Sequence, residues 1–221
     1  MKSPSAWLLS LGVLACLLGC VAPARADTAP AAAGQDPSQV VQTVAQGFLK
    51  DLDAHRDQYS KNLSLLRQAV DRDVVPYFDV PYAARLVLAR YWRTATPQQQ
   101  QDFINAFESS MFTNYGSALL GFQSNRLQVL PTRTDPGATN AIVRTLIRRD
   151  DGSTVSVNFA LHQTANGWKA WDVIVEGISY VKSFRDDFGA QIQQQGLDAV
   201  IKRLRNGGQP AALQNAGNKP S

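Results

Sequence analysis

Apolar side chains at helical spacing predict three helices between residues 37 and 92. The first begins near Pro37, with Asp36 as its N-cap. The second ends before Pro76, and the third runs from about Pro81 to Trp92. The apolar faces of the first two helices are marked by Val40, Val44, Phe48 and Leu52 and by Leu63, Leu66 and Val70. This part of the chain is therefore expected to be helical.

A fourth helix is predicted by its N-terminal signal and by an aromatic stripe. Thr96-Pro97-Gln98-Gln99 has the pattern of a capping box with proline at the first helical position. Five apolar residues then follow at a constant spacing of four: Phe103, Phe107, Met111, Tyr115 and Leu119. A stripe this long must face another apolar surface, and we expect that surface to be a sheet.

Alternating apolar and polar residues predict four strands after residue 126. They cover Leu127 to Arg133, Ala141 to Arg149, Thr154 to Gln163 and Trp168 to Glu176. The turns between them are short and contain glycine, and such turns join neighbouring antiparallel strands. Two more helices, from about Ile178 to Gln194 and from Leu197 to Leu204, follow the strands. The predicted fold class is α+β: a four-stranded antiparallel meander sheet packed against helices, with an apolar cavity between them.

The N-terminal segment has the features of a cleaved signal peptide. Lys2 precedes an apolar run from Ala6 to Val21, which is shorter than the roughly 20 residues that span a bilayer. Ala24-Arg25-Ala26 then provides the pattern that signal peptidase recognises. We predict a signal peptide over residues 1–26, a flexible lead over 27–36, a single domain over 37–205 and a disordered tail over 206–221. An uncleaved membrane anchor and lipid attachment at Cys20 are the alternatives.

Composition narrows the function classes. Both cysteines, Cys16 and Cys20, lie in the predicted signal peptide, so the mature chain has no disulfide. Lys2 and Arg25 lie there too, and their loss lowers the formal net charge from +4 to +2. This charge is too small to predict a nucleic-acid partner, and secretion argues against one as well. No later stretch is apolar enough to span a membrane, so the mature protein is expected to be soluble.

Residues that usually carry catalysis are sparse. The two histidines, His55 and His162, have neither the spacing of metal ligands nor a nucleophile motif beside them. Asp172 and Glu176 stand in an otherwise apolar strand, where an acid is paired with a base, exposed at an edge, or active in acid–base chemistry. We predict no catalytic residue, metal or cofactor. A small dehydratase or isomerase built on Asp172, Glu176 and His162 is the enzymatic alternative.

Several stretches, taken in order, resemble the MlaC family, also called the toluene-tolerance Ttg2D family. They are Pro76-Tyr77-Phe78-Asp79, the ARLVLARYWR segment that starts at Ala84, ATPQQ from Ala95, GWKAWDV from Gly167 and EGIS from Glu176. The resemblance covers about residues 38–205. Two positions depart from the family pattern: Ala89 replaces a common glycine, and Trp171 stands where tyrosine or another residue is common. If Trp171 points inward, it would narrow the cavity.

The resemblance implies a function. Family members are periplasmic phospholipid-binding proteins of the Mla lipid-asymmetry system, and they hold the acyl chains in an apolar cavity with the head group near its mouth. It also implies two partners: an inner-membrane ABC transporter with an MCE-domain ring, and an outer-membrane lipoprotein–porin complex. We therefore expect a monomeric carrier of diacyl phospholipid. A carrier of another apolar lipid, such as a hopanoid, and a non-catalytic envelope adaptor are the alternatives.

Stripe position and the family pattern together select two sets of candidate residues. The candidates for the lipid pocket are Phe78, Leu86, Phe107, Met111, Tyr115, Leu119, Val143, Val173, Val175, Tyr180 and Phe184. The candidates for contact with the head group or a partner are Arg85, Arg90, Arg93, Lys182 and Arg185. For each residue the alternative is an ordinary place in the core or an ordinary solvated charge.

Overall fold

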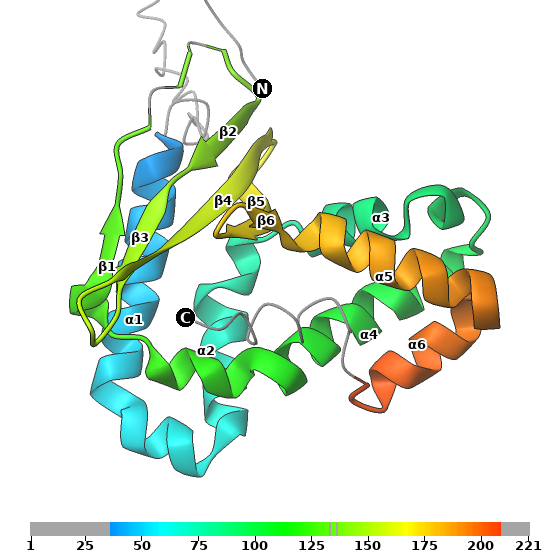
Figure 1. The fold of residues 1–221 in the computed structure, drawn as a ribbon, viewed down its shortest axis with the longest axis horizontal. Helices are drawn as coiled ribbons and strands as arrows, with labels where there is room; N and C mark the ends of the chain where they lie inside the picture. Colours follow the sequence, from blue (N-terminus) through cyan, green and yellow to red (C-terminus); the bar gives the residue numbers. More distant parts are fainter. Residues whose placement is uncertain (1–35, 133, 136, 209–221) are drawn as a thin grey trace, which may run out of the picture. The chain divides into compact units, whose positions relative to one another are not determined.

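The computed structural model describes residues 36–132, 134–135 and 137–208 (Figure 1). The predicted signal peptide, Cys20, nearly all of the predicted lead and the tail after residue 208 lie outside the described residues. The helices are α1 (Pro37–Lys61), α2 (Leu63–Asp73), α3 (Val80–Leu88), α4 (Pro97–Tyr115), α5 (Tyr180–Gln195) and α6 (Leu197–Arg205), with short 3₁₀ segments η1 (Val75–Tyr77), η2 (Ala89–Arg93), η3 (Gly116–Gly121) and η4 (Ser124–Arg126). The strands are β1 (Leu127–Val129), β2 (Asn140–Val143), β3 (Thr145–Arg148), β4 (Thr154–Thr164), β5 (Gly167–Val175) and β6 (Ile178–Ser179).

The predicted helix starts are confirmed by their caps. The Asp36 carboxylate accepts a hydrogen bond from the backbone N–H of Ser38 at 2.9 Å. At the start of α4, the Thr96 hydroxyl accepts from the Gln99 backbone, and the Gln99 side chain accepts from the Thr96 backbone. These bonds satisfy N–H groups that have no partner within the helix, which is why these residue types begin helices.

The third helix ends earlier than the apolar pattern predicts. Ala89 has φ 47° and ψ −114°, a conformation in which α-helical geometry cannot continue. The chain therefore leaves α3 after Leu88 and continues as η2 instead of as an α-helix to Trp92. In the MlaC family, which the sequence resembles, glycine is common at this position, and glycine tolerates positive φ.

The sheet is antiparallel and follows the predicted meander order, with more strands than predicted. Its strand order is β1-β3-β4-β5-β6, and β2 also pairs with β4. The predicted second strand is divided at Arg144 into β2 and β3. Thr145, which begins β3, pairs with Val129 of β1, and its N–H donates to the Asn158 side chain of β4 at 3.4 Å. After β5, a turn at Glu176 and Gly177 with φ of 49° and 81° forms the short β6. The α+β prediction is confirmed, and the described residues contain six strands in place of the four predicted.

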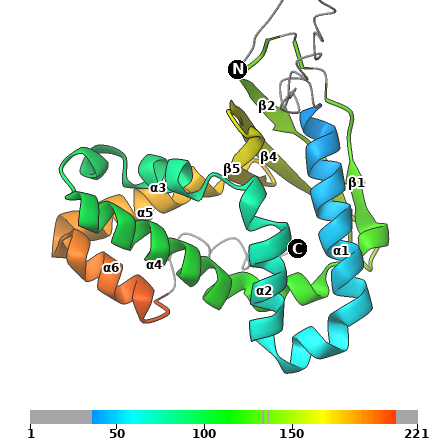
Figure 2. The ribbon, with the colours of Figure 1, turned by 180° about the vertical axis from the view of Figure 1, so that it is seen from behind.

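The core of the described residues is divided into clusters against the sheet, among the later helices, and between α1 and α2, the last of which contains Leu52 and Leu66. In Figure 2, α1 lies along the sheet beside β1, and a buried cluster there contains Val41, Val143 and Leu161. A second cluster joins α3, α4, α5 and α6. In it, the ring of Phe103 meets that of Phe188 on α5 edge to face at 5.7 Å. The expectation that the aromatic stripe of α4 packs on the sheet is therefore wrong for its first residues, Phe103 and Phe107, whose rings meet aromatic side chains of α5.

Candidate binding pocket

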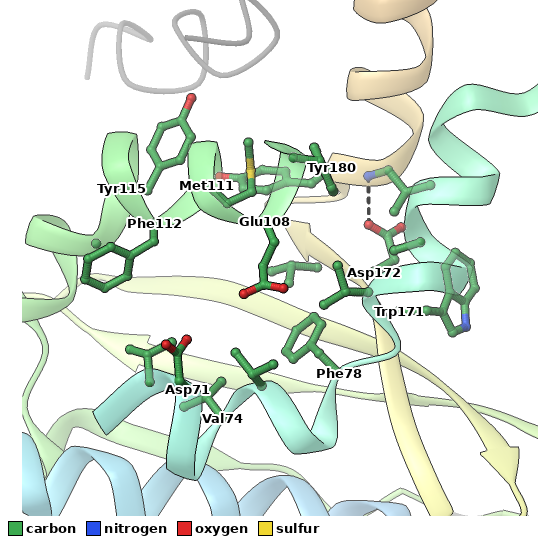
Figure 3. Close-up of a pocket in the computed structure, with 18 of the residues that line it drawn as sticks. Asp71, Val74, Phe78, Glu108, Met111, Phe112, Tyr115, Trp171, Asp172 and Tyr180 are labelled. Atoms are coloured by element: carbon green, nitrogen blue, oxygen red, sulfur yellow. Dashed lines mark hydrogen bonds between the residues drawn. The ribbon is translucent and has the colours of Figure 1, made fainter. Parts of the chain in front are cut away.

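An apolar pocket of about 290 Å³ opens between α2, η1, α4, β5 and the start of α5 (Figure 3). Its size is near the lower end of the range of ligand pockets, which is about 300–1,000 Å³. The apolar lining from α2, η1 and the residues after them consists of Val70, Val74, Val75, Phe78, Val80 and Ala83. The opposite side is formed by Phe107, Met111, Phe112, Tyr115, Gly116 and Leu119, with Trp171, Val173, Tyr180, Val181 and Phe184 from β5 and α5.

The wall at Phe78 is held in place by Asp79. The backbone N–H of Asp79 donates to the carbonyl of Ala170 on β5 at 2.8 Å. Its carboxylate caps α3 through the N–H of Tyr82 and lies 2.9 Å from Nε2 of His162 on β4. The ring of Tyr82 packs on the imidazole of His162, with centroids 4.4 Å apart. His162 thus belongs to a structural corner that joins α3 to the sheet next to the pocket.

Asp172 joins β5 to α5 and is 4% exposed. One carboxylate oxygen accepts from the Ser179 hydroxyl at 2.5 Å, and the other accepts from the backbone N–H of Val181 at 3.0 Å. A carboxylate is stabilised at this place because the N-terminus of a helix carries partial positive charge. Asp172 is therefore paired, as one of the predicted roles requires, but its partners are hydrogen-bond donors at the start of α5 and not a basic side chain. Glu176 lies exposed in the turn after β5, and its carboxylate accepts from the Ser156 N–H.

A charged cluster occupies the open side of the pocket. Nε of Arg67 on α2 lies 2.7 Å from the Asp71 carboxylate, and Nη2 lies 2.5 Å from the Glu108 carboxylate on α4. The guanidinium carbon lies 5.2 Å from the centre of the Phe112 ring. The side chains of Arg67, Asp71 and Glu108 are 29%, 46% and 31% exposed, whereas Val181 and Phe184 in the lining are buried. These exposures define the mouth of the pocket and its deep end.

Two tyrosines of the lining keep their protons. Burial raises the pKa of the Tyr180 phenol. Burial also raises the pKa of Tyr115, with smaller contributions from Tyr180 and Asp187. Both phenols are therefore neutral at physiological pH, as an apolar pocket requires.

Eight of the eleven candidates for the lipid pocket lie in this lining: Phe78, Phe107, Met111, Tyr115, Leu119, Val173, Tyr180 and Phe184. The other three lie elsewhere. Val143 is fully buried between the sheet and α1, and Leu86 packs against the helical cluster. Val175 lies at the end of β5 opposite Val157 and Ile178. Trp171 borders the pocket (Figure 3). The centroids of the Trp171 and Tyr82 rings lie 5.8 Å apart in an edge-to-face contact with α3.

The five basic candidates are exposed and lie outside the pocket lining: Arg85, Arg90, Arg93, Lys182 and Arg185. Arg90 and Arg185 border a separate hollow of about 330 Å³ beside Ala89. The charge at the mouth comes instead from Arg67, Asp71 and Glu108, which sequence reasoning missed. The spacing of Arg67 and Asp71 is typical of a helical ion pair, but the approach of Glu108 depends on how α2 and α4 pack.

The described part of the chain has neither a cluster of metal ligands nor a membrane-spanning helix. No group of three or more His, Cys, Asp or Glu residues there could hold a metal ion. Within the same residues, no helix combines the length and the apolar character needed to cross a bilayer.

The described fold and pocket agree with a known family. The family model of the MlaC protein matches residues 42–206. The chain belongs to the MlaC family. It is 34% identical over 167 residues to the toluene tolerance protein ttg2D of Pseudomonas putida, which covers 75% of this chain and 77% of that protein. It is 23% identical over 182 residues to the intermembrane phospholipid transport system binding protein MlaC of Haemophilus influenzae, over 80% of this chain and 85% of the relative.

A solved structure shares the MlaC fold. The phospholipid-binding protein from Ralstonia solanacearum, solved in complex with a phospholipid, superposes with a TM-score of 0.73. The match covers 82% of this chain and 99% of that chain, at 25% sequence identity. The fold described here is therefore one in which a phospholipid is bound in at least one relative.

Proposed function

We propose that this chain is a phospholipid carrier that acts without catalysis and holds acyl chains in the pocket between α2, α4, β5 and α5. The observation that carries the proposal is the pocket itself: an opening lined almost entirely by aliphatic and aromatic side chains within an MlaC fold. The phospholipid bound to the Ralstonia relative and the transport role in the name of the Haemophilus relative support it.

The physical chemistry suits a passive carrier. Burial of one methylene contributes about 0.8 kcal/mol, so two chains of about 16 carbons represent roughly 25 kcal/mol against water. A free lipid therefore crosses an aqueous space too rarely to be useful. Transfer from one apolar site to another has almost no net hydrophobic term, so a carrier of this kind needs no energy source of its own.

The proposal extends to compartment and partners. The chain would act in the periplasm after removal of residues 1–26, and its predicted partners are the inner-membrane ABC transporter with an MCE-domain ring and the outer-membrane lipoprotein–porin complex. The exposed basic residues, which include Arg90, Arg93 and Arg185, are candidates for these contacts. They lie away from the pocket mouth, so a partner and a bound head group need not compete for them.

Native mass spectrometry of the mature protein, purified without detergent, tests the proposal. We expect a folded protein with stoichiometric added mass that extracts as phospholipid. Extraction of a hopanoid would keep the carrier mechanism and change the cargo. A mass without ligand, together with no lipid uptake from labelled vesicles, would contradict the proposal and favour the alternative of a non-catalytic envelope adaptor.

A further inference from the structure

The mouth of the pocket carries an unequal set of charges. Four described lining residues are charged, and Asp172 is one of them, buried and hydrogen-bonded at the start of α5. The other three gather at the mouth, where a single guanidinium, that of Arg67, faces the carboxylates of Asp71 and Glu108. The mouth therefore has one negative charge in excess, although the chain as a whole has a formal net charge of +4.

Arg67 keeps capacity for a further acceptor. Its Nε and Nη2 make the bonds to Asp71 and Glu108, and within the described residues Nη1 has no hydrogen-bond partner. A guanidinium presents five N–H donors in a fixed plane, and phosphate is an acceptor that it binds well. The Phe112 ring lies 5.2 Å from the guanidinium carbon. The guanidinium is thus held in place between a ring and two carboxylates, with one end open.

The carboxylates offer a second type of contact. Figure 3 shows the Glu108 side chain directed from α4 into the space between α4 and α2, on which Asp71 lies. Its carboxylate and that of Asp71 can accept hydrogen bonds from an ammonium group, or attract a quaternary ammonium. In a zwitterionic phospholipid this positive group is separated from the phosphate by two carbons. An anionic lipid without a positive group would bring its charge next to two carboxylates that have only Arg67 to balance them.

We infer that Arg67, Asp71 and Glu108 form a head-group site that selects zwitterionic phospholipids over net-anionic ones. Arg67 binds the phosphate through Nη1, and Glu108 and Asp71 face the ammonium group. This inference rests on the proposed function, since it specifies the lipid class that the same pocket holds. The side chains are partly exposed, so solvent and salt weaken the discrimination, and we expect a preference of about three- to tenfold.

Competition within one vesicle tests the inference. The protein is incubated with vesicles that contain equal amounts of phosphatidylethanolamine and phosphatidylglycerol with identical acyl chains, re-isolated and extracted, and the two lipids are quantified by mass spectrometry. Because both lipids are in the same vesicle, attraction of the basic protein to an anionic surface affects both equally. We expect the native protein to be enriched in phosphatidylethanolamine.

Charge-neutralising variants identify the groups responsible. Glu108→Gln and Asp71→Asn should each raise the bound ratio of phosphatidylglycerol to phosphatidylethanolamine about three- to tenfold, and high salt should reduce the difference. Asp186→Asn removes the same charge from an exposed position of α5 outside the lining and should leave the ratio unchanged.

Two results would overturn the inference in distinguishable ways. Bound lipid in the native protein with a ratio that neither Glu108→Gln nor Asp71→Asn changes would refute the head-group site and leave the carrier function intact. Recovery of neither lipid from the native protein would refute the carrier function, and the head-group site with it.

Discussion

Replacement of Ala89 by glycine is expected to stabilise the protein. Ala89 has φ 47° and ψ −114°, which places its Cβ in steric conflict with its own backbone. Strain of this kind costs about 1–3 kcal/mol, and glycine would remove it. Glycine also adds backbone entropy to the unfolded state, which costs about 0.5–1 kcal/mol. The methyl group is exposed, so its removal leaves no cavity. The net gain in unfolding free energy is then about 0.5–2 kcal/mol.

Urea unfolding followed by circular dichroism measures this change, and thermal unfolding should show a rise in Tm of about 1–8 °C. Ala190→Gly is the matched control, because Ala190 is an exposed residue within α5. The same substitution there should lower stability by about 0.5–1 kcal/mol. A loss of stability in Ala89→Gly like that of Ala190→Gly would refute the strain at Ala89.

Three further predictions concern the pocket and its walls. Val173→Trp places an indole in the pocket and should weaken lipid binding in a vesicle-uptake assay. Exclusion of even four methylene groups of an acyl chain would cost about 3 kcal/mol, or on the order of a hundredfold in lipid affinity. Ile174→Trp, on the opposite face of β5, should keep lipid binding in the same assay. Asp172→Asn should lower the unfolding free energy by about 2–3 kcal/mol, because the amide cannot accept from both donors at the start of α5; a loss no larger than that of Glu176→Gln in denaturant titration would contradict this. Burial raises the pKa of Tyr115 and Tyr180, so the folded state holds phenolic protons that the unfolded state loses above about pH 10. Stability should therefore fall as the pH rises beyond that value, and Tyr180→Phe should reduce the slope of unfolding free energy against pH.

Local signals account for the parts of the fold that the sequence predicted well. The capping box at Thr96 and Gln99 acts through bonds between residues three apart, and the structure contains both of them. The order of the strands in the sheet was likewise predicted from a local signal, the short turns that join neighbouring antiparallel strands. The break between β2 and β3 was not predicted, because the alternation of apolar and polar residues continues through Arg144; beside the break, the N–H of Thr145 donates to the Asn158 side chain on the neighbouring strand. The early end of α3 was indicated only by the family resemblance, in which glycine is common at the position of Ala89.

The candidate pocket shows the same division. The spacing of four along α4 placed Phe107, Met111 and Tyr115 on a common side, and all three lie in the lining. Spacing alone does not identify the opposite wall, so Val143 was expected in the pocket although it is buried against α1. The charged mouth was missed because the Arg67–Glu108 pair joins residues 41 positions apart. Contacts of that kind depend on how helices pack, and a pattern along one helix does not reveal them.

Photochemical cross-linking of a bound phospholipid tests the central claim most directly. A phospholipid with a diazirine near the end of one acyl chain is loaded from vesicles, irradiated, and mapped by peptide mass spectrometry. We expect cross-links to α4 and the first turns of α5, at residues such as Phe107, Met111 and Phe184, which line the pocket. Cross-links confined to the cluster around Val143 and Leu161, or a loaded lipid that labels only the exposed surface, would contradict it.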